Sequence, residues 1–436
     1  MGDRLLFDDE ALSPPAAPGD GDEELTHEEP RLRVPNRRQV MLRSVDLESL
    51  LDNDHEARAL WALLERLDLS AFYAKVKARG SAPGRSATDP RLLLCLWTYA
   101  TSQGVGSARE LAQLCDEHDA YRWICGGVTV NRDMLAAFRV DHGAELDALF
   151  TELLAVLLEN GLVTLRRVAH DGMRVRASAG AASFRREKTL KQCMREARRQ
   201  LEHVKKLADE DPTRLRERAA QERAAKERED RIDRALKRLP QAQKLQGREK
   251  ARVSTTDPEA RVMKMPDGGF RPAYNVQLAT DVDSRVVVGV GVTNVGSDAG
   301  QLLPMLDDVE ERLASPDELL VDGGFVNLRA IDAAERRDVT VYAPVPTPRK
   351  KGIDPHERKP NDTDESFAWR TRMATDEAKD VYRDRAATAE TVNADLKEHR
   401  GLRQFPVRGL SKVTTIALLA AFTYNALRAL SLGMLG

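Results

Sequence analysis

The stretch LVTLRRVAHD, residues 162–171, marks the point where the apolar pattern of the chain changes. Its first seven residues form a short β-prone run, which ends at His170 and Asp171. Further β-prone runs follow at 274–280, 286–292, 319–321 and 339–345, with helical patterns at 301–313 and 328–336. Strands interspersed with helices predict an α+β (mixed α/β) domain. We assign residues 162–436 to it.

The residues before this stretch have a helical pattern instead. The apolar residues recur at three-to-four spacing in Leu60, Leu63, Leu64 and Leu67. Asp89 before Pro90 predicts the start of a second helix, and Ser107 with Glu110 predicts a capping box that opens a third. A longer pattern predicts one helix over residues 132–160. We therefore expect an all-helical domain at 41–161. The turn at 103–106 is typical of a helix-turn-helix that binds DNA, and equally of plain helix packing.

A strongly basic segment interrupts the second domain. Residues 185–252 contain 23 bases and 13 acids, although the net charge of the whole chain is −2. Apolar residues four and three apart (Leu190, Met194, Ala197, Leu201 and Val204) predict a helix, and a second one follows the break at Asp211-Pro212. This pattern indicates an inserted helical hairpin. Its charge suits DNA, its apolar stripe suits one packing partner such as a second subunit, and a solvated spacer is the alternative.

Composition limits the class of protein. The chain has 436 residues, 42% hydrophobic and 32% charged, which predicts two or three domains with cores. Residues 1–30 hold ten acids and one base, and the acidic, Pro-rich stretch 1–40 is expected to be disordered and not a signal peptide. The four cysteines lack metal-site spacing and indicate a reducing compartment. The apolar run 413–427 is short for a membrane span and predicts a buried terminal helix.

Two aspartates carry the first sign of chemistry. Asp171 and Asp322 each follow a β-prone run and precede glycine. Side chains at the ends of neighbouring strands converge, so two such aspartates predict a shared site. A turn-forming Asp-Gly pair is the alternative for each. Phe325 is interpreted either as a core residue or as a residue that stacks on an unpaired base.

The segment YRDRAATAETVNADLKEHRGLRQFPVRG, residues 382–409, resembles the signature of DDE transposases from bacterial insertion sequences. Glu390 is followed seven residues later by Lys397 and preceded seven residues earlier by Arg383, which places all three on one helix face. The same resemblance extends to VAHDGMRVRASAG (168–180), FRPAYNVQLATDVDSRVVVGVGVTN (270–294), LLVDGGF (319–325) and GRSATDPRLLLCLWTYATSQGVGSARELAQL (84–114). The types resembled are insertion-sequence-five and eleven-eighty-two.

The resemblance implies an RNase-H-like catalytic domain with Asp171, Asp322 and Glu390 as the three catalytic acids. They would bind two Mg²⁺ ions, for which Mn²⁺ substitutes. The implied DNA-binding residues are Arg383, Arg385, Lys397, Arg400 and Arg408. Four residues separate Arg385 from Glu390, whereas this family often has three, so the role of Arg385 is open.

The function implied is binding of the terminal inverted repeats, metal-dependent cleavage of double-stranded DNA and strand transfer to target DNA. We expect a homodimer or larger oligomer on DNA, in the bacterial cytoplasm at the nucleoid and away from membranes. The alternatives are a catalytically silent DNA-binding descendant and a metal-dependent nuclease without strand transfer. A tyrosine-recombinase role for Tyr382 lacks the accompanying Arg-His-Arg set.

Overall fold

The computed structural model describes residues 38, 44, 46–80, 86–210, 215–247, 249–348 and 352–433. All but one residue of the acidic stretch 1–40 therefore lie outside the described residues, as does Asp211-Pro212. The elements that follow belong to one compact unit that begins at Asp46.

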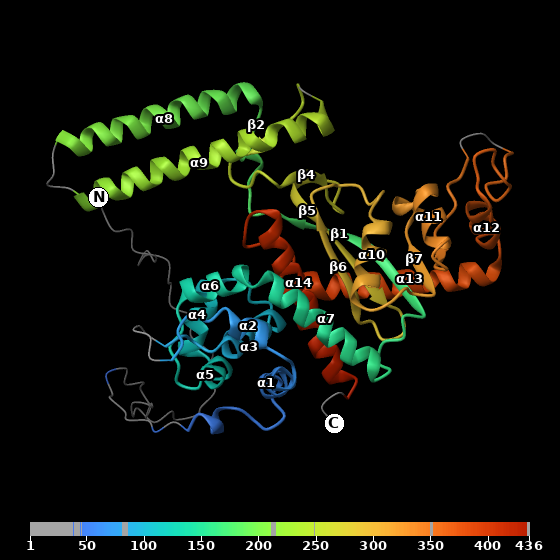
Figure 1. Ribbon diagram of the computed structural model, residues 1–436, viewed down its shortest axis with the longest axis horizontal. Coiled ribbons are helices and arrows are strands. Elements are labelled where there is room, and N and C mark those ends of the chain that lie inside the picture. Colours follow the sequence, from blue (N-terminus) through green and yellow to red (C-terminus); the bar gives the residue numbers. More distant parts are fainter. Residues whose placement is uncertain are drawn as a thin grey trace, which may run out of the picture. The chain divides into compact units, whose positions relative to one another are not determined.

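Helices form the first part of this unit (Figure 1). After a short 3-10 turn, η1 (Glu48–Leu50), come α1 (Glu56–Arg66), α2 (Ser70–Ala74), α3 (Pro90–Ser102), α4 (Ala108–Glu117), α5 (Asp119–Cys125), α6 (Arg132–Asp141) and α7 (Gly143–Glu159). Two predicted starts are confirmed: the Asp89 carboxylate accepts from Arg91 N, and the Ser107 hydroxyl accepts from Glu110 N.

The prediction of one helix over 132–160 is wrong, because the chain breaks between α6 and α7 at His142 (φ −113°, ψ 35°). Tertiary packing explains the break. The His142 ring packs on Phe72 and Phe138 at centroid distances of 5.6 and 4.5 Å. A Cβ on Gly143 would lie 2.7 Å from the Thr415 hydroxyl of the terminal helix α14 (Leu410–Ser431), so α7 starts where the backbone can approach α14 closely.

A mixed sheet forms the centre of the second part. It contains β1 (Arg167–Arg176), β4 (Arg261–Lys264), β5 (Phe270–Asp281), β6 (Val287–Thr293), β7 (Glu318–Val321) and β8 (Thr340–Tyr342). The order is β4-β5-β1-β7-β8, and β6 pairs with β5. β5 runs antiparallel to β1, β4 and β6, whereas β1, β7 and β8 are parallel. The α+β class is therefore confirmed.

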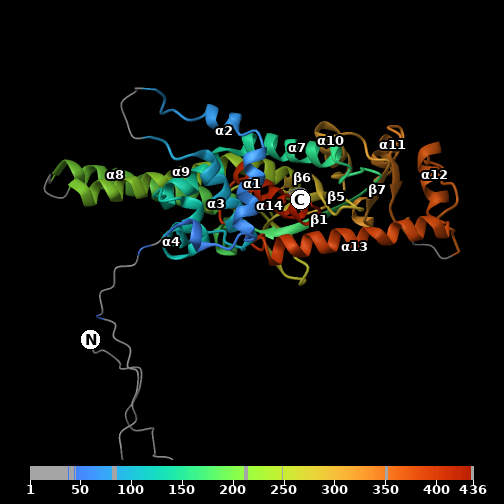
Figure 2. The same cartoon turned by 90° about the horizontal axis from the view of Figure 1, so that it is seen from below.

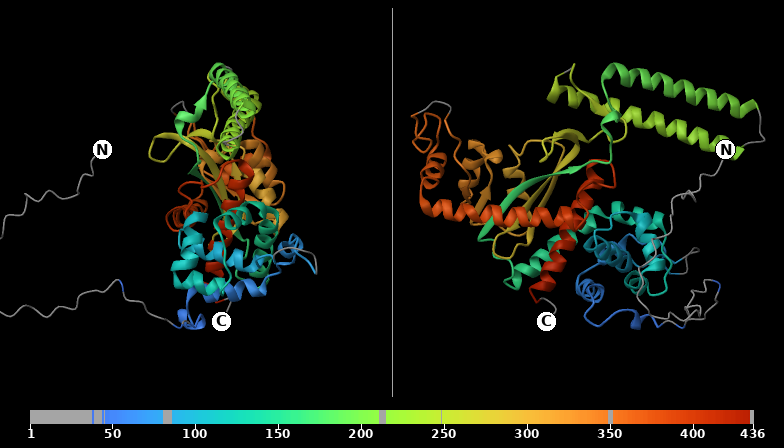
Figure 3. Two further views of the ribbon diagram at one scale, coloured as in Figure 1. Left: turned by 90° about the vertical axis from the view of Figure 1, so that its left-hand side faces the viewer. Right: turned by 180° about the vertical axis from the view of Figure 1, so that it is seen from behind.

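Helices cover both faces of this sheet. α10 (Leu302–Arg312) packs on β5 and β6, where Gly289 leaves room for Met305 and Val309. α11 (Leu328–Glu335) packs on β8. α12 (Asp364–Arg372) precedes the long helix α13 (Asp376–Glu398), which contacts β1, β5, β7 and β8 (Figure 3).

The first strand differs from its prediction. β1 begins at Arg167 rather than at residue 162, because Leu165 has a left-handed backbone (φ 54°) that interrupts the extended chain. The Asp281 carboxylate accepts from Leu165 N and holds this turn. Asp171 lies inside β1, paired with Leu278, and not at the end of a strand, because β1 continues beyond it to Arg176 as the antiparallel partner of β5.

The basic segment 185–252 contains two antiparallel helices between the small strands β2 (Phe184–Arg185) and β3 (Val253–Ser254). These are α8 (Glu187–Glu210) and α9 (Leu215–Gln246) (Figure 2). The predicted apolar stripe is buried inside the hairpin, where it forms small cores with Ile232, Ala235 and Leu239. The partner of the stripe is thus α9, and the interpretation that it serves a second subunit is wrong.

The terminal helix α14 (Leu410–Ser431) is buried against α3, α7 and β6, which confirms the prediction for 413–427. Asn425 inside it exchanges two hydrogen bonds with the Val287 backbone, at 2.9 and 2.7 Å. By length and composition alone α14 is apolar enough to cross a membrane, but 78% of its most apolar window is buried within the protein. The apolar side chains of α3, α7, α14 and the sheet form one continuous core.

Candidate active site

Asp171 and Asp322 lie side by side on neighbouring parallel strands. The register pairs His170 of β1 with Val321, the last residue of β7, so the next pair is Asp171 and Asp322. Neighbouring strands are about 4.8 Å apart. Burial raises the pKa of Asp171; Arg385 and the Gly172 amide oppose this shift, and the negative charge of Asp322 adds to it. The structure therefore brings together two of the three predicted acids.

Helix α13 covers this pair with polar side chains. Asn393 donates a hydrogen bond of 2.8 Å from Nδ2 to Asp171 Oδ2. The Arg385 guanidinium lies 3.8 Å from Asp171 Oδ1. Arg385 also lies over the Tyr382 ring, 5.8 Å from its centroid, and its Nε is buried without a hydrogen-bond partner. Arg385 thus faces Asp171 and has an N–H donor, at Nε, that is not hydrogen-bonded.

Lys397 lies on the same side of α13, one helical turn beyond Asn393. Burial lowers the pKa of Lys397, whereas the charge of Asp171 acts in the opposite direction. A lysine placed so close to the carboxylate pair can contact an anionic group that enters the site.

Glu390 is one helical turn before Asn393, and its side chain is exposed. Among the residues that the structure describes, no three His, Cys, Asp or Glu side chains lie close enough together to hold one metal ion. The third predicted acid is therefore next to the pair, but it does not join it in this structure.

A buried polar network supports β1 from its other face. Asp298, in the loop after β6, accepts hydrogen bonds from Asn275 (2.7 Å), Gln277 (2.9 Å) and Arg174 (2.7 Å). Burial raises the pKa of Asp298, but these donors outweigh it and the pKa lies below the usual value. Gln277 also bonds the His170 ring at 2.8 Å. Burial lowers the pKa of His170 to about 4, so the ring is neutral.

Two further contacts of this network bear on the site. A Cβ on Gly172 would lie 2.3 Å from Asp298 Oδ1, so only glycine fits beside Asp171. Phe325 is fully buried against His170, with ring centroids 4.4 Å apart. The core interpretation of Phe325 is confirmed, and the interpretation that it stacks on a base is wrong.

Three predicted DNA-binding residues lie outside this group. Arg383 is exposed and pairs with Asp380 at 2.6 Å. Arg400 pairs with Asp395 at 2.8 Å and donates to the Ser102 carbonyl at 2.6 Å, so it ties the end of α13 to α3. Arg408 is exposed and donates to the Ser178 carbonyl at 3.1 Å.

Sequence reasoning missed Asn393 and Asp298. Asn393 had a usable signal, because it is three residues after Glu390 and therefore one turn away on the same helix. Asp298 had none, since its partners lie on two strands, β1 and β5, that are distant from it in sequence.

Comparison with known protein families identifies two domains in the chain. Two family models match: "Transposase DDE domain" over residues 232–426 and "Transposase domain (DUF772)" over residues 45–141. The first contains Asp322 and Glu390, while the hairpin α8–α9 separates Asp171 from it. No curated protein and no solved structure was found to match the chain. Both matches are transposase domains, and together they indicate a DDE transposase of an insertion sequence, of the insertion-sequence-five and eleven-eighty-two types.

Proposed function

We propose that this transposase binds the terminal inverted repeats of its element, cleaves DNA at the element's ends and joins the freed 3′-hydroxyls to target DNA. The catalytic acids are Asp171, Asp322 and Glu390. The observation that carries this proposal is the side-by-side placement of Asp171 and Asp322 beneath α13, the helix that bears Glu390. We assign recognition of the element's ends to the helices of 41–161. The protein acts as a dimer or larger assembly, since two element ends must be joined to one target.

The sheet supports an RNase-H-like catalytic domain over 162–436. A central β1 lies between the antiparallel strands β5 and β6 on one side and the parallel strands β7 and β8 on the other, as expected of that fold. The α8–α9 hairpin is inserted after β1. The acids at adjacent strand positions lie at the centre of this sheet, where the substrate would meet both.

The residues present suit a divalent cation. DDE transposases generally use one, and the carboxylate oxygens of Asp171 and Asp322 are hard ligands of the kind Mg²⁺ prefers. Burial and the neighbouring carboxylate make the ionised form of Asp171 unfavourable, so a cation there would be stabilising. When bound, a pair of such ions activates the attacking hydroxyl and stabilises the leaving oxygen. Glu390 would complete the ligand set through a change of its exposed side chain.

The neighbouring side chains have distinct roles in this proposal. The Asn393 amide holds Oδ2 of Asp171 and so orients that carboxylate. Arg385 and Lys397 lie beside Asp171 and would bind the non-bridging oxygens of the phosphate to be cut. Arg383 is exposed and would exchange its ion pair with Asp380 for phosphates farther along the DNA, whereas Arg400 serves packing.

The test measures cleavage of DNA that carries the element's ends, with Mg²⁺ or Mn²⁺ and with a chelator. Asp171→Asn, Asp322→Asn and Glu390→Gln each remove one ligand at nearly constant volume, and each should abolish cleavage while binding persists. Glu377→Gln is the matched control, because Glu377 is an exposed carboxylate in the first turn of the same helix, α13. Residual cleavage within about tenfold of wild type would remove that acid from the site. Pre-cleaved ends with a target plasmid distinguish strand transfer from simple hydrolysis.

One observation favours a second candidate, a DNA-binding descendant without cleavage. The three acids do not converge, because Glu390 is exposed. In that case the wild-type protein would bind end DNA but leave it uncut with either metal, and Glu390→Gln would change nothing.

A further inference from the structure

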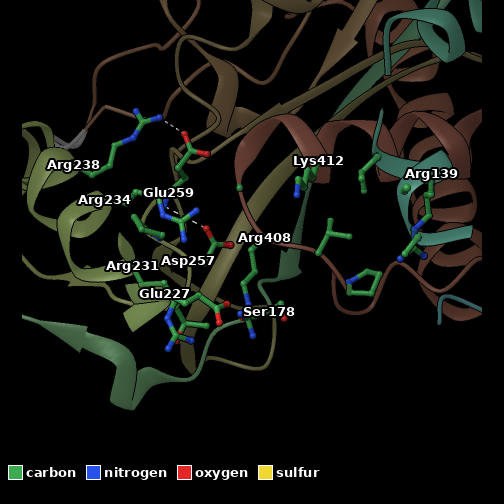
Figure 4. A pocket seen from close by; sticks show the side chains of 18 of the residues that line it. Arg139, Ser178, Glu227, Arg231, Arg234, Arg238, Asp257, Glu259, Arg408 and Lys412 are labelled. Carbon is green, nitrogen blue, oxygen red and sulfur yellow. Dashed lines mark hydrogen bonds and ion pairs between the residues drawn. The ribbon is translucent and has the colours of Figure 1, made fainter. Parts of the chain in front are cut away.

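A second concave surface lies apart from Asp171, Asp322 and Glu390. It is a groove of about 810 Å³, and none of the residues around Asp171 lines it. Its walls come from α9, from residues 256–259 between β3 and β4, from residues 406–412 and from α6 (Figure 4). Segments distant in sequence therefore build one site.

The groove is rich in positive charge. Seven Lys or Arg residues line it against three acids, Glu227, Asp257 and Glu259. One of these acids, Glu259, is paired with Arg238. Arg231 and Arg234 lie on α9, Arg408 and Lys412 lie on the opposite wall, and Arg139 lies on α6. Charges of one sign on facing walls create a field that attracts an anion.

Arg139 is the strongest sign that an anion belongs there. Its side chain is 8% exposed and lies over the Trp97 ring, 4.1 Å from the centroid. One hydrogen bond, to the Gly106 carbonyl at 2.6 Å, is recorded for it, and its Nε has no partner. Within the described part of the chain no carboxylate pairs with it. Burial lowers its pKa to about 10, so it remains charged at neutral pH. A buried charge without a counter-charge is costly, and an anion in the groove would offset that cost.

The spacing of the cations suits a polymer of phosphates better than a small anion. Arg231, Arg234 and Lys237 or Arg238 recur every three or four residues along α9, so they follow one edge of the groove. Residues 231–238 extend over about 10.5 Å. One DNA strand carries a phosphate about every 3.4 Å along the helix axis, so this edge matches roughly three nucleotides.

We propose that this groove binds the phosphate backbone of duplex DNA beside the DNA segment held at Asp171. The proposal rests on the function proposed above and adds a second contact site to it. Ser178, on the groove, is seven residues beyond Asp171 and two residues past the end of β1. At about 3.3 Å per residue this is roughly 23 Å, which corresponds to about seven base pairs of the same duplex.

The experiment measures the affinity of the full chain for a 30-base-pair duplex of arbitrary sequence, by fluorescence anisotropy over a series of salt concentrations. The groove variant is Arg231→Gln, Arg234→Gln and Lys412→Gln together. The matched control removes the same charge from exposed hairpin positions outside the groove, as Arg195→Gln, Arg199→Gln and Lys226→Gln. Thermal melts verify that both variants are folded.

Loss of three phosphate contacts should lower the slope of log affinity against log salt by about 2.7 and weaken binding more than tenfold. The control should stay within about twofold of wild type. An unchanged slope in the groove variant, or an equal loss in the control, would overturn the proposal. So would tighter, groove-dependent binding of duplex RNA of the same sequence.

A separate measurement keeps this proposal distinct from the proposed function. Wild type and the groove variant are each tested for metal-dependent cleavage of end DNA as well as for the salt slope. If the wild type shows no metal-dependent cleavage but the groove variant has a lower salt slope, the catalytic function is refuted and the groove proposal stands. If the wild type cleaves DNA but the groove variant has the same salt slope as the wild type, only the groove proposal is refuted.

Discussion

Gly172 tests the link between the buried network and the catalytic strand. In Gly172→Ala the new Cβ would lie 2.3 Å from Asp298 Oδ1 and 2.6 Å from Gln277 Nε2. Both side chains are buried, with 8% and 2% exposed, so neither can turn into solvent. Overpacking of a core costs about 1–3 kcal/mol. Loss of one hydrogen bond to the Asp298 carboxylate adds about 1.5–3 kcal/mol. We expect the substitution to destabilise the protein by about 2.5–6 kcal/mol, the sum of these two costs, and to impair cleavage through displacement of Asp171.

The assay is urea denaturation, with hydrogen exchange of the β1 amides to localise the effect. Gly180→Ala is the control, because nothing lies within 4 Å of a Cβ at that position and its backbone is not left-handed. It should change stability by less than about 0.5 kcal/mol. If Gly172→Ala is equally silent, Asp298 does not constrain β1 and the supporting role of the network is refuted.

Three further outcomes follow from the charges of the site. Burial raises the pKa of Asp171, so its ionisation opposes folding as pH rises through that pKa. Asp171→Asn should therefore raise the melting temperature at neutral pH without metal. An equally large gain in melting temperature at acid pH would contradict this reasoning. The pKa of His170 is lowered to about 4, so the unfolded chain binds more protons between that pH and about 6.5. The free energy of unfolding should therefore fall as pH decreases from about 6.5 to about 4, and His170→Gln should flatten this fall. Lys397→Ala should lower the salt slope of end binding by about 0.9, the loss of one phosphate contact; an unchanged slope would mean that Lys397 belongs to a solvated helix face and does not contact DNA.

Replacement of residues 185–252 by a short Gly-Ser linker is the remaining prediction. The hairpin has small cores of its own, separate from the main core, so the rest of the protein should stay folded. DNA binding should weaken, because α9 forms one wall of the groove. A folded deletion that binds DNA as tightly as the parent would make the hairpin a spacer.

The local sequence pattern was sufficient to predict many of the helices and strands of this protein. Caps at Asp89 and Ser107, the β-prone runs that became β5, β6 and β7, and the apolar terminal helix depend on neighbours a few residues away, so they can be recognised in the sequence. Asp171, Asp322 and Glu390 were named from residue type and family resemblance.

Tertiary structure decided what local pattern could not. The break at His142, the shift of β1 caused by Leu165, and the partner of the hairpin stripe depend on contacts with distant segments. The same holds for the site itself, because Asn393 and Arg385 meet Asp171 across more than two hundred residues of chain. Burial and neighbouring charge set the pKa of Asp171, and both arise only when β1, β7 and α13 pack together.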